Sequence, residues 1–137
     1  MDQDHLHYGL SLKLYFNTKA FGPGMAALLE GIEKTGSLQG AAQEMHMAYS
    51  KAWKMLKESE REWGFALTER ETGGRDGGGS TLTPQAKVLL EAYSRFMEEA
   101  RTQLDQLFKA HFPDSWVEEL RVSSLEKEDK AGKELER

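Results

Sequence analysis

The sequence contains no cysteine. This absence excludes a disulfide scaffold, a thiolate zinc site and a cysteine nucleophile in one step. No run of apolar residues approaches the roughly 18 that a membrane-spanning helix needs. The polar, acidic start MDQDHLHYG also lacks the basic and apolar regions of a secretory signal. We therefore expect a cytoplasmic protein that makes no contact with membranes.

An excess of positive charge is also missing, since the formal net charge is -5. This balance argues against a chain that binds nucleic acid through bulk charge. The charge is uneven, however, because residues 34–87 hold eight Lys and Arg against seven Asp and Glu. With 137 residues, 39% of them apolar, the chain is expected to form one compact domain with an attached helix or tail.

Residues that could carry catalysis or hold a metal are few and scattered. His5 and His7 have the spacing of two ligands on a strand, but they lie in a terminus that is expected to be frayed. His46 and His111 are isolated. No nucleophile, base and orienting group come together in any segment. We therefore predict no enzyme, no metal site and no cofactor.

Apolar residues at helical spacing predict three helices in the first half of the chain. The first begins at Pro23 and ends before Gly36. The second is only about two to three turns long and has Ser37 as its N-cap. The third runs from Tyr49 until Gly64 stops it.

Short strands and one long helix are expected around these three helices. Residues 10–16, LSLKLYF, alternate as in a half-buried strand, with Leu10, Leu12, Leu14 and Phe16 facing inwards. Residues 66–71 and 80–83 bracket a glycine-rich loop and predict a hairpin. Pro84 opens a helix to about residue 111, which would be about 40 Å long. It carries a heptad seam over about three repeats, so it is expected to pack against a partner. The seam consists of Ala86, Leu90, Tyr93, Met97, Ala100, Leu104 and Leu107.

A short helix, a tight turn and a longer helix from Tyr49 form a helix-turn-helix pattern, in which the second helix reads the major groove of DNA. If Ala52, Trp53 and Leu56 face the core, the opposite side is positive. It would present Ser50, Lys51, Lys54, Lys57 and Arg61. Trp53 and Trp63 are expected to be core anchors rather than platforms for stacked bases. Lysines on an exposed helix face commonly do no more than solvate it, so they do not establish DNA binding alone.

The segment TGGRDGGGSTLTP, residues 72–84, nearly spells a phosphate-binding loop. Gly79 stands where such a loop needs lysine, and a short strand is expected to follow instead of a helix. Glycine's freedom of backbone angle suits a wing tip that lies against DNA, with Arg70 and Arg75 near phosphates or the minor groove. A hairpin end without a binding role is the plain alternative.

Two stretches together resemble the N-terminal DNA-binding domain of ModE, the molybdate-responsive transcriptional regulators related to the LysR type. They are GSLQGAAQEMHMAYSKAWKMLKE and LTERETGGRDGGGSTLTPQAKVLLEAY, and the similarity spans about residues 10–110. It implies a homodimer on a palindromic site in duplex DNA, held largely by the first and last long helices. In the last helix the dimerisation residues would be Leu90, Tyr93, Met97, Ala100, Leu104 and Leu107. By motif, Ser50, Lys51 and Lys54 match the recognition helix. The wing matches Arg70, Thr72, Gly73, Gly74 and Arg75.

The chain departs from that family at three points. A charged tail stands where the oxyanion-binding domains of ModE proteins would begin, so molybdate sensing by this chain alone is not expected. Asp76 occupies a place where the family has small or neutral residues, and the segment MHM, residues 45–47, replaces a glycine-bearing turn.

The sequence thus predicts a mainly α protein with a small β-hairpin wing. The expected parts are a flexible start (1–9), a winged helix-turn-helix (10–83), a long dimerisation helix (84–112) and a charged, mobile tail (113–137). The candidate DNA-binding residues are Ser37, Tyr49, Ser50, Lys51, Lys54, Arg70, Thr72, Gly73, Gly74 and Arg75. The predicted function is sequence-specific regulation of transcription. The alternatives are a winged-helix adaptor that binds a protein and a nucleotide-binding enzyme.

Overall fold

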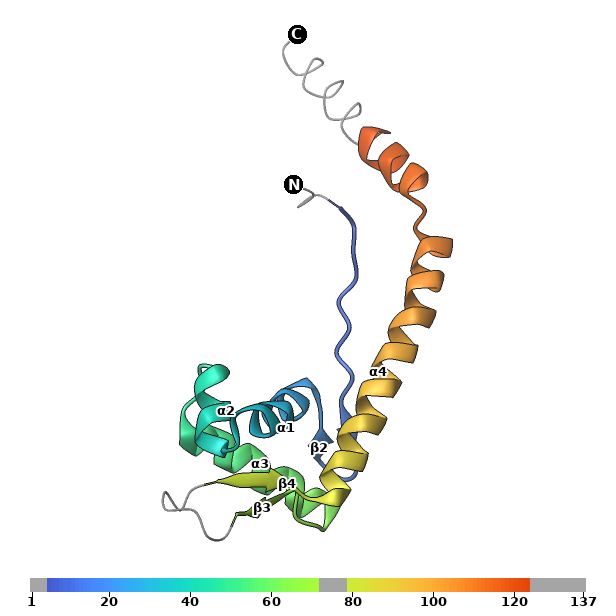
Figure 1. Ribbon diagram of the computed structural model, residues 1–137. Helices are drawn as coiled ribbons and strands as arrows, with labels where there is room; N and C mark the ends of the chain where they lie inside the picture. Colours follow the sequence, from blue (N-terminus) through green and yellow to red (C-terminus); the bar gives the residue numbers. More distant parts are fainter. Residues whose placement is uncertain (1–4, 72–78, 124–137) are drawn as a thin grey trace. The chain divides into compact units, whose positions relative to one another are not determined.

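The computed structural model describes residues 5–71 and 79–123 (Figure 1). Its backbone contacts divide the chain into two units, residues 11–98 and residues 1–10 together with 99–137. The elements follow in the order β1 (Leu14–Tyr15), β2 (Lys19–Phe21), α1 (Pro23–Thr35), α2 (Leu38–Glu44), α3 (Tyr49–Trp63), β3 (Thr68–Arg70), β4 (Ser80–Leu82) and α4 (Pro84–His111). The predicted helices and the hairpin are all confirmed.

The ends of α1 and α2 follow from local chemistry. Pro23 starts α1, and Gly36 ends it with φ of 82°, a left-handed conformation that costs glycine little. The Ser37 hydroxyl then accepts a hydrogen bond from the Gly40 amide at 2.9 Å and caps α2. Gly36 and Ser37 therefore connect α1 directly to α2, the first helix of the helix-turn-helix.

The turn between α2 and α3 is a Schellman motif. The His46 amide donates to the Gln43 carbonyl at 3.1 Å, and the Met47 amide donates to the Ala42 carbonyl at 2.9 Å. His46 occupies the position that normally holds glycine and has φ of 53°. The segment MHM therefore makes the same turn as glycine would, but with a side chain in a left-handed conformation.

The core of residues 11–98 lies between α1, α2, α3, the hairpin and the start of α4. Its largest fully buried side chains are Phe21, Leu28, Leu29, Ile32 and Leu67. Gly31 permits the close approach of α1 and α2, because a Cβ there would lie 2.9 Å from the Ala41 Cβ. This packing fixes α2 and its partner α3 on the domain.

The N-terminal strand is shorter than the alternation predicts. β1 pairs antiparallel with β2, which the sequence reasoning missed, and the register shifts between Leu14 and Tyr15. Because of this irregularity the alternation stops, so Leu12 and Leu14 pack on the core while Phe16 is exposed. The expectation that Phe16 faces inwards is therefore wrong, although its ring lies 4.9 Å from that of Trp63.

The hairpin is joined at both ends to the rest of the domain. At its base, the Thr83 hydroxyl donates to the Ala66 carbonyl at 2.8 Å and accepts from the Ala86 amide in the first turn of α4. At its other end, the Ser80 amide donates to the Gly36 carbonyl at 2.7 Å. These contacts fix the hairpin between the end of α1, against which β4 packs, and the start of α4.

The second unit contains the start of the chain and the later part of α4. Tyr8 donates hydrogen bonds to the Asp105 carboxylate and to the Arg101 carbonyl, and its ring lies 5.3 Å from that of Phe108. Residues 114–123 are helical, although the sequence predicts a mobile tail from residue 113. No helix in the described ranges is long and apolar enough to cross a membrane.

Candidate nucleic-acid interface

The lysines at the start of α3 are exposed, as the helical spacing predicts. Ser50, Lys51 and Lys54 all lie on the solvent side of the helix. The Lys54 ammonium is 4.0 Å from the Glu58 carboxylate, and both side chains are largely exposed. Within residues 5–71 and 79–123, Lys51 forms no ion pair. Both ammonium groups can therefore reach a ligand at little cost.

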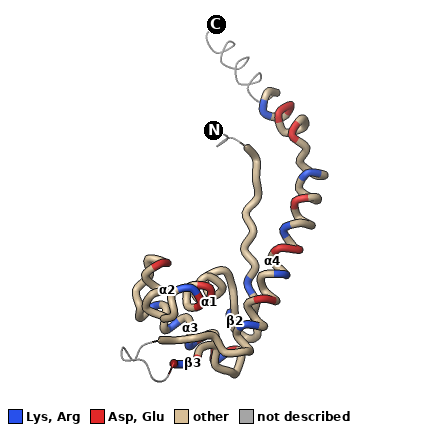
Figure 2. Tube along the Cα trace, in the orientation of Figure 1, with Lys and Arg blue, Asp and Glu red and all other residues tan. Residues whose placement is uncertain are grey.

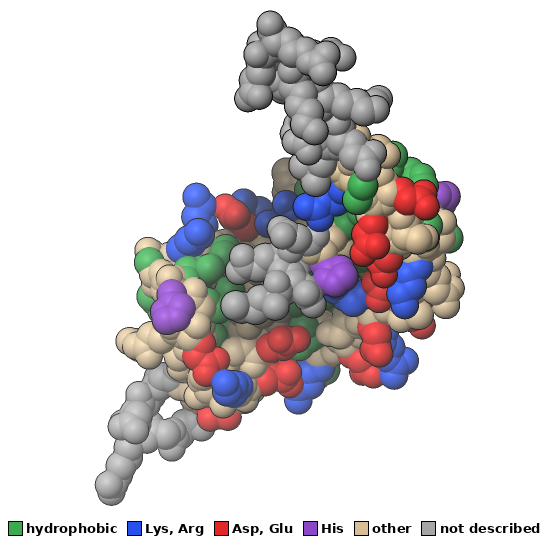
Figure 3. Space-filling view, turned by 90° about the horizontal axis from the view of Figure 1, so that it is seen from above, with side chains coloured by type: hydrophobic (Ala, Val, Ile, Leu, Met, Phe, Trp, Pro, Cys, Tyr) green, Lys and Arg blue, Asp and Glu red, His purple; other side chains and the backbone are tan. Residues whose placement is uncertain are grey.

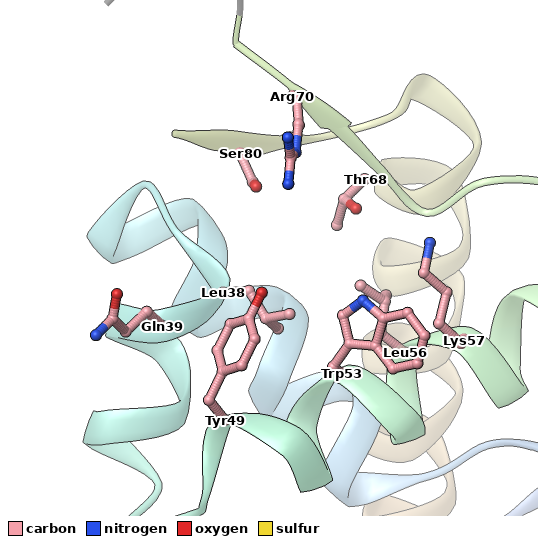
Figure 4. A pocket seen from close by; sticks show the side chains of 9 residues that line it. All are labelled: Leu38, Gln39, Tyr49, Trp53, Leu56, Lys57, Thr68, Arg70 and Ser80. Atoms are coloured by element: carbon pink, nitrogen blue, oxygen red, sulfur yellow. The ribbon is translucent and has the colours of Figure 1, made fainter. Parts of the chain in front are cut away.

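Between α3 and the β3–β4 hairpin lies a cavity of about 720 Å³, which we call the α3–hairpin groove (Figure 4). In Figure 4, Tyr49 and Trp53 rise into it from α3, and Arg70 reaches down from the hairpin. The residues that line it are Leu38, Gln39, Tyr49, Trp53, Leu56, Lys57, Thr68, Arg70 and Ser80.

The prediction that Trp53 is a core anchor is wrong. Its side chain is 49% exposed, whereas Ala52 and Leu56 are buried. Neighbouring positions on a helix are about 100° apart, so Ala52 and Trp53 cannot both occupy the middle of the buried stripe. Ala52 takes that place, and Trp53 is turned towards the hairpin. Trp63 agrees more closely with its predicted role as a core anchor. It is partly buried against the core, and its indole N–H donates to the Ala20 carbonyl at 3.0 Å.

The sequence reasoning also missed Gln39, Thr68 and Ser80, and it gave Lys57 only a place on the outer helix face. A signal for Trp53 was available, since it lies four residues after Tyr49 and so on the same side of α3. The hairpin residues could be found only by knowing that β3 and β4 lie across from α3.

Lys57 is held in place by two neighbours. Its ammonium lies 3.2 Å from the Glu60 carboxylate and 5.7 Å from the centre of the Trp53 ring. Glu60 in turn accepts a hydrogen bond from the Leu67 amide at 2.7 Å. Because Glu60 is itself anchored, Lys57 has a defined position at the edge of the groove.

The remaining candidates of the sequence analysis divide into two groups. The Ser37 hydroxyl is engaged as the cap of α2, so its contribution is to position the helix pair. Thr72, Gly73, Gly74 and Arg75, with Asp76, lie outside the described residues. After Gly79 the chain enters β4 as predicted, and not a helix that could receive a phosphate.

The predicted dimer seam is partly used in the core of the chain itself. Leu90 and Tyr93 are buried, and the Tyr93 hydroxyl donates to the Leu12 carbonyl at 2.8 Å while its ring meets Phe21. Burial raises the pKa of Tyr93. Both residues therefore stabilise the core of residues 11–98. Farther along α4, Met97, Ala100 and Leu104 are half-buried and Leu107 is 52% exposed.

Charges of both signs are mixed along α4 (Figure 2) and on the face drawn in Figure 3. Acidic and basic residues alternate along α4 (Figure 2), and the face in Figure 3 has no wide area of one sign. No group of three or more His, Asp or Glu in the described part of the chain could hold a metal ion.

Comparison with known proteins identifies the domain. Residues 26–87 match the bacterial regulatory helix-turn-helix proteins of the lysR family. The chain is 37% identical over 94 residues to the molybdenum transport protein ModE of Herbaspirillum seropedicae, covering 69% of this chain and 33% of that protein. It is 32% identical over 99 residues to the DNA-binding transcriptional dual regulator ModE of Escherichia coli K12, covering 72% and 37%.

Solved structures show the same fold. A complex of the CbnR DNA-binding domain with DNA matches 64% of this chain and 95% of that chain, with a TM-score of 0.52 and 22% identity. Full-length CbnR, a LysR family transcriptional regulator, matches with a TM-score of 0.50. This chain spans about a third of the length of the ModE proteins it matches. It therefore carries a winged helix-turn-helix domain of the lysR family, homologous to a part of the ModE regulators.

Proposed function

We propose that this protein binds specific sequences of duplex DNA and regulates transcription. In this proposal the first half of α3 enters the major groove and presents Tyr49, Ser50, Lys51 and Lys54 to bases and phosphates. The observation that carries the proposal is the exposed, lysine-bearing side of α3 in a helix-turn-helix of the lysR family. The DNA-binding role named for the Escherichia coli ModE relative supports it.

We also propose that the protein acts as a homodimer on a palindromic site. The support is the part of α4 beyond Tyr93, where Met97, Ala100, Leu104 and Leu107 continue the heptad spacing without being fully buried in the subunit. A two-fold dimer would place its two α3 helices about 34 Å apart, one turn of DNA, or a multiple of that distance.

The oligomeric state can be tested by sedimentation equilibrium. Leu107→Glu places a charge on the seam and is expected to shift the protein towards monomer, because charge burial at a dimer interface is costly. Val88→Glu is a suitable control, since Val88 is also an exposed apolar residue of α4 but lies outside the heptad positions. Equal association of both variants would contradict the proposed seam.

DNA binding can be tested by a gel shift on genomic fragments at several salt concentrations. We expect retarded bands that weaken steeply as salt rises, because phosphate contacts release counterions. Absence of binding at low salt would favour the second candidate, an adaptor that binds a protein. That candidate is supported by the net charge of -5 and by exposed apolar side chains late in the chain, including Phe112, Trp116 and Leu120.

A further inference from the structure

The α3–hairpin groove has an unusual set of polar side chains. All of them can donate a hydrogen bond, and none is a carboxylate. They are Gln39, Tyr49, Trp53, Lys57, Thr68, Arg70 and Ser80. The chain has 23 acidic and 18 basic residues, but the groove lining contains Lys57 and Arg70 and no carboxylate. Lys57 is paired with Glu60 behind the lining, so Arg70 is the lining's main positive charge. Such a lining suits a ligand rich in anionic acceptors.

Strand geometry produces this separation of charge on the hairpin. Successive side chains of a strand point to opposite faces, so Thr68 and Arg70 share one face and Glu69 lies on the other. Thr68 and Arg70 line the groove, as does Ser80, which pairs with Arg70 in the register of β3 and β4. The sequence TER therefore gives the groove its donors and keeps the carboxylate of Glu69 out of its lining.

The helical side of the groove adds exposed aromatic surface. Tyr49 is 51% and Trp53 49% exposed, and they lie one turn apart on the same side of α3. The apolar face of an indole can pack against a sugar ring, and its single N–H can donate a hydrogen bond to a neighbouring phosphate. The groove also adjoins the start of α3, where the proposed base contacts lie.

We propose that the α3–hairpin groove holds the sugar–phosphate backbone of one DNA strand. Trp53 packs against a deoxyribose, while Tyr49 and Arg70 donate hydrogen bonds to phosphates. This assignment rests on the proposed DNA-binding function and extends it, because it gives the hairpin-facing side of α3 a positioning role that carries no base specificity. Base reading then belongs to the outward side of α3.

Tryptophan fluorescence tests where Trp53 goes in the complex. The chain has three tryptophans, and Trp63 is half-buried. In the Trp116→Phe variant, Trp53 is therefore the only largely exposed tryptophan. We expect a DNA fragment selected from genomic sequences to lower the acrylamide quenching of this variant by about two-fold, because a sugar would cover the exposed indole. In the Trp53→Phe control, the quenching of Trp116 should not change.

Binding measurements test what Trp53 contributes. Trp53→Ala should weaken binding by about ten-fold on selected and random duplexes alike, with an unchanged salt slope, because the lost contact is apolar. Arg70→Ala should instead lower the salt slope by about one. Val88→Ala, which removes exposed apolar surface from α4, is the matched control and should bind as the original protein does. Thermal melting of each variant checks that the fold is retained.

The outcomes separate this inference from the proposed function. If duplex DNA binds while Trp53 stays open to acrylamide and Trp53→Ala binds normally, the groove assignment is wrong and the DNA-binding proposal stands. If neither the original protein nor any variant binds duplex DNA, the groove assignment and the DNA-binding proposal both fail. If a poly-glutamate peptide protects Trp53 and duplex DNA does not, the groove belongs to an acidic protein partner and the inference is overturned.

Discussion

The effects of Lys51→Ala and Lys54→Ala on DNA binding follow directly from the geometry of α3. Ala52 and Leu56 are buried, so Lys54, about half a turn from both, points most directly outwards. Lys51 lies to one side of that direction. We therefore expect Lys54→Ala to be the more damaging change.

Neither substitution should disturb the fold. Lys51 and Lys54 are exposed, and the Lys54–Glu58 pair at 4.0 Å is 75% and 52% exposed at its two side chains. A solvent-exposed pair of this kind contributes at most about 0.5 kcal/mol to the free energy of unfolding. A loss of affinity can therefore be assigned to the contact with DNA.

The size of the loss distinguishes two kinds of contact. If the Lys54 ammonium meets a base edge, its removal should cost about 1 to 3 kcal/mol, or about 5- to 150-fold in affinity, and relax the preference at one base pair. If it meets a phosphate, affinity should fall equally on all sequences, and the salt slope should fall by about one.

Fluorescence anisotropy with a selected fragment and a random duplex, at several salt concentrations, measures both quantities. Lys109→Ala removes an exposed lysine from the last turn of α4 and serves as the charge-matched control. Unchanged affinity and salt slope in both α3 variants would refute the assignment of α3 as the recognition helix.

Three further predictions concern stability in urea or thermal unfolding. Gly31→Ala should destabilise the protein by about 1 to 3 kcal/mol, because its Cβ would lie 2.9 Å from that of Ala41. Gly9→Ala is the control and should be nearly neutral, because no atom lies within 4 Å of a new Cβ there. Equal effects of the two substitutions would contradict the close packing of Gly31 on Ala41. His46→Gly should stabilise the protein by roughly 0.5 to 1 kcal/mol, because relief of a side chain at φ of 53° outweighs the greater freedom of glycine in the unfolded chain, and a lower melting temperature would contradict this. Tyr93→Phe should cost about 1 kcal/mol through loss of a 2.8 Å hydrogen bond to a main-chain carbonyl, and a neutral result would mean that this bond adds nothing to stability.

Much of the fold could be predicted from local sequence alone. Pro23, Gly36, Ser37 and Gly64 mark helix ends by their own backbone and hydrogen-bonding preferences, and the structure confirms the bounds they predict. The two strands around the glycine loop and the long helix from Pro84 are confirmed for the same reason. These signals act over a few residues, so no tertiary contact is needed to read them.

The site was less accessible to such reasoning. The outward lysines of α3 follow from helical period, but the choice between Ala52 and Trp53 for the buried stripe depends on how closely α3 packs on the domain. Likewise, Leu90 and Tyr93 fit a dimer seam by spacing, and only the folded core shows that they are buried within the chain itself.

The sequence by itself thus determined the order and ends of the helices, the turn between α2 and α3, and the separation of donors from carboxylate on β3, because each depends on neighbours along the chain. Only the tertiary structure decided that Trp53, Arg70 and Ser80 share one groove. These three residues come from segments up to 27 positions apart, and it is the packing of the hairpin beside α3 that brings them together.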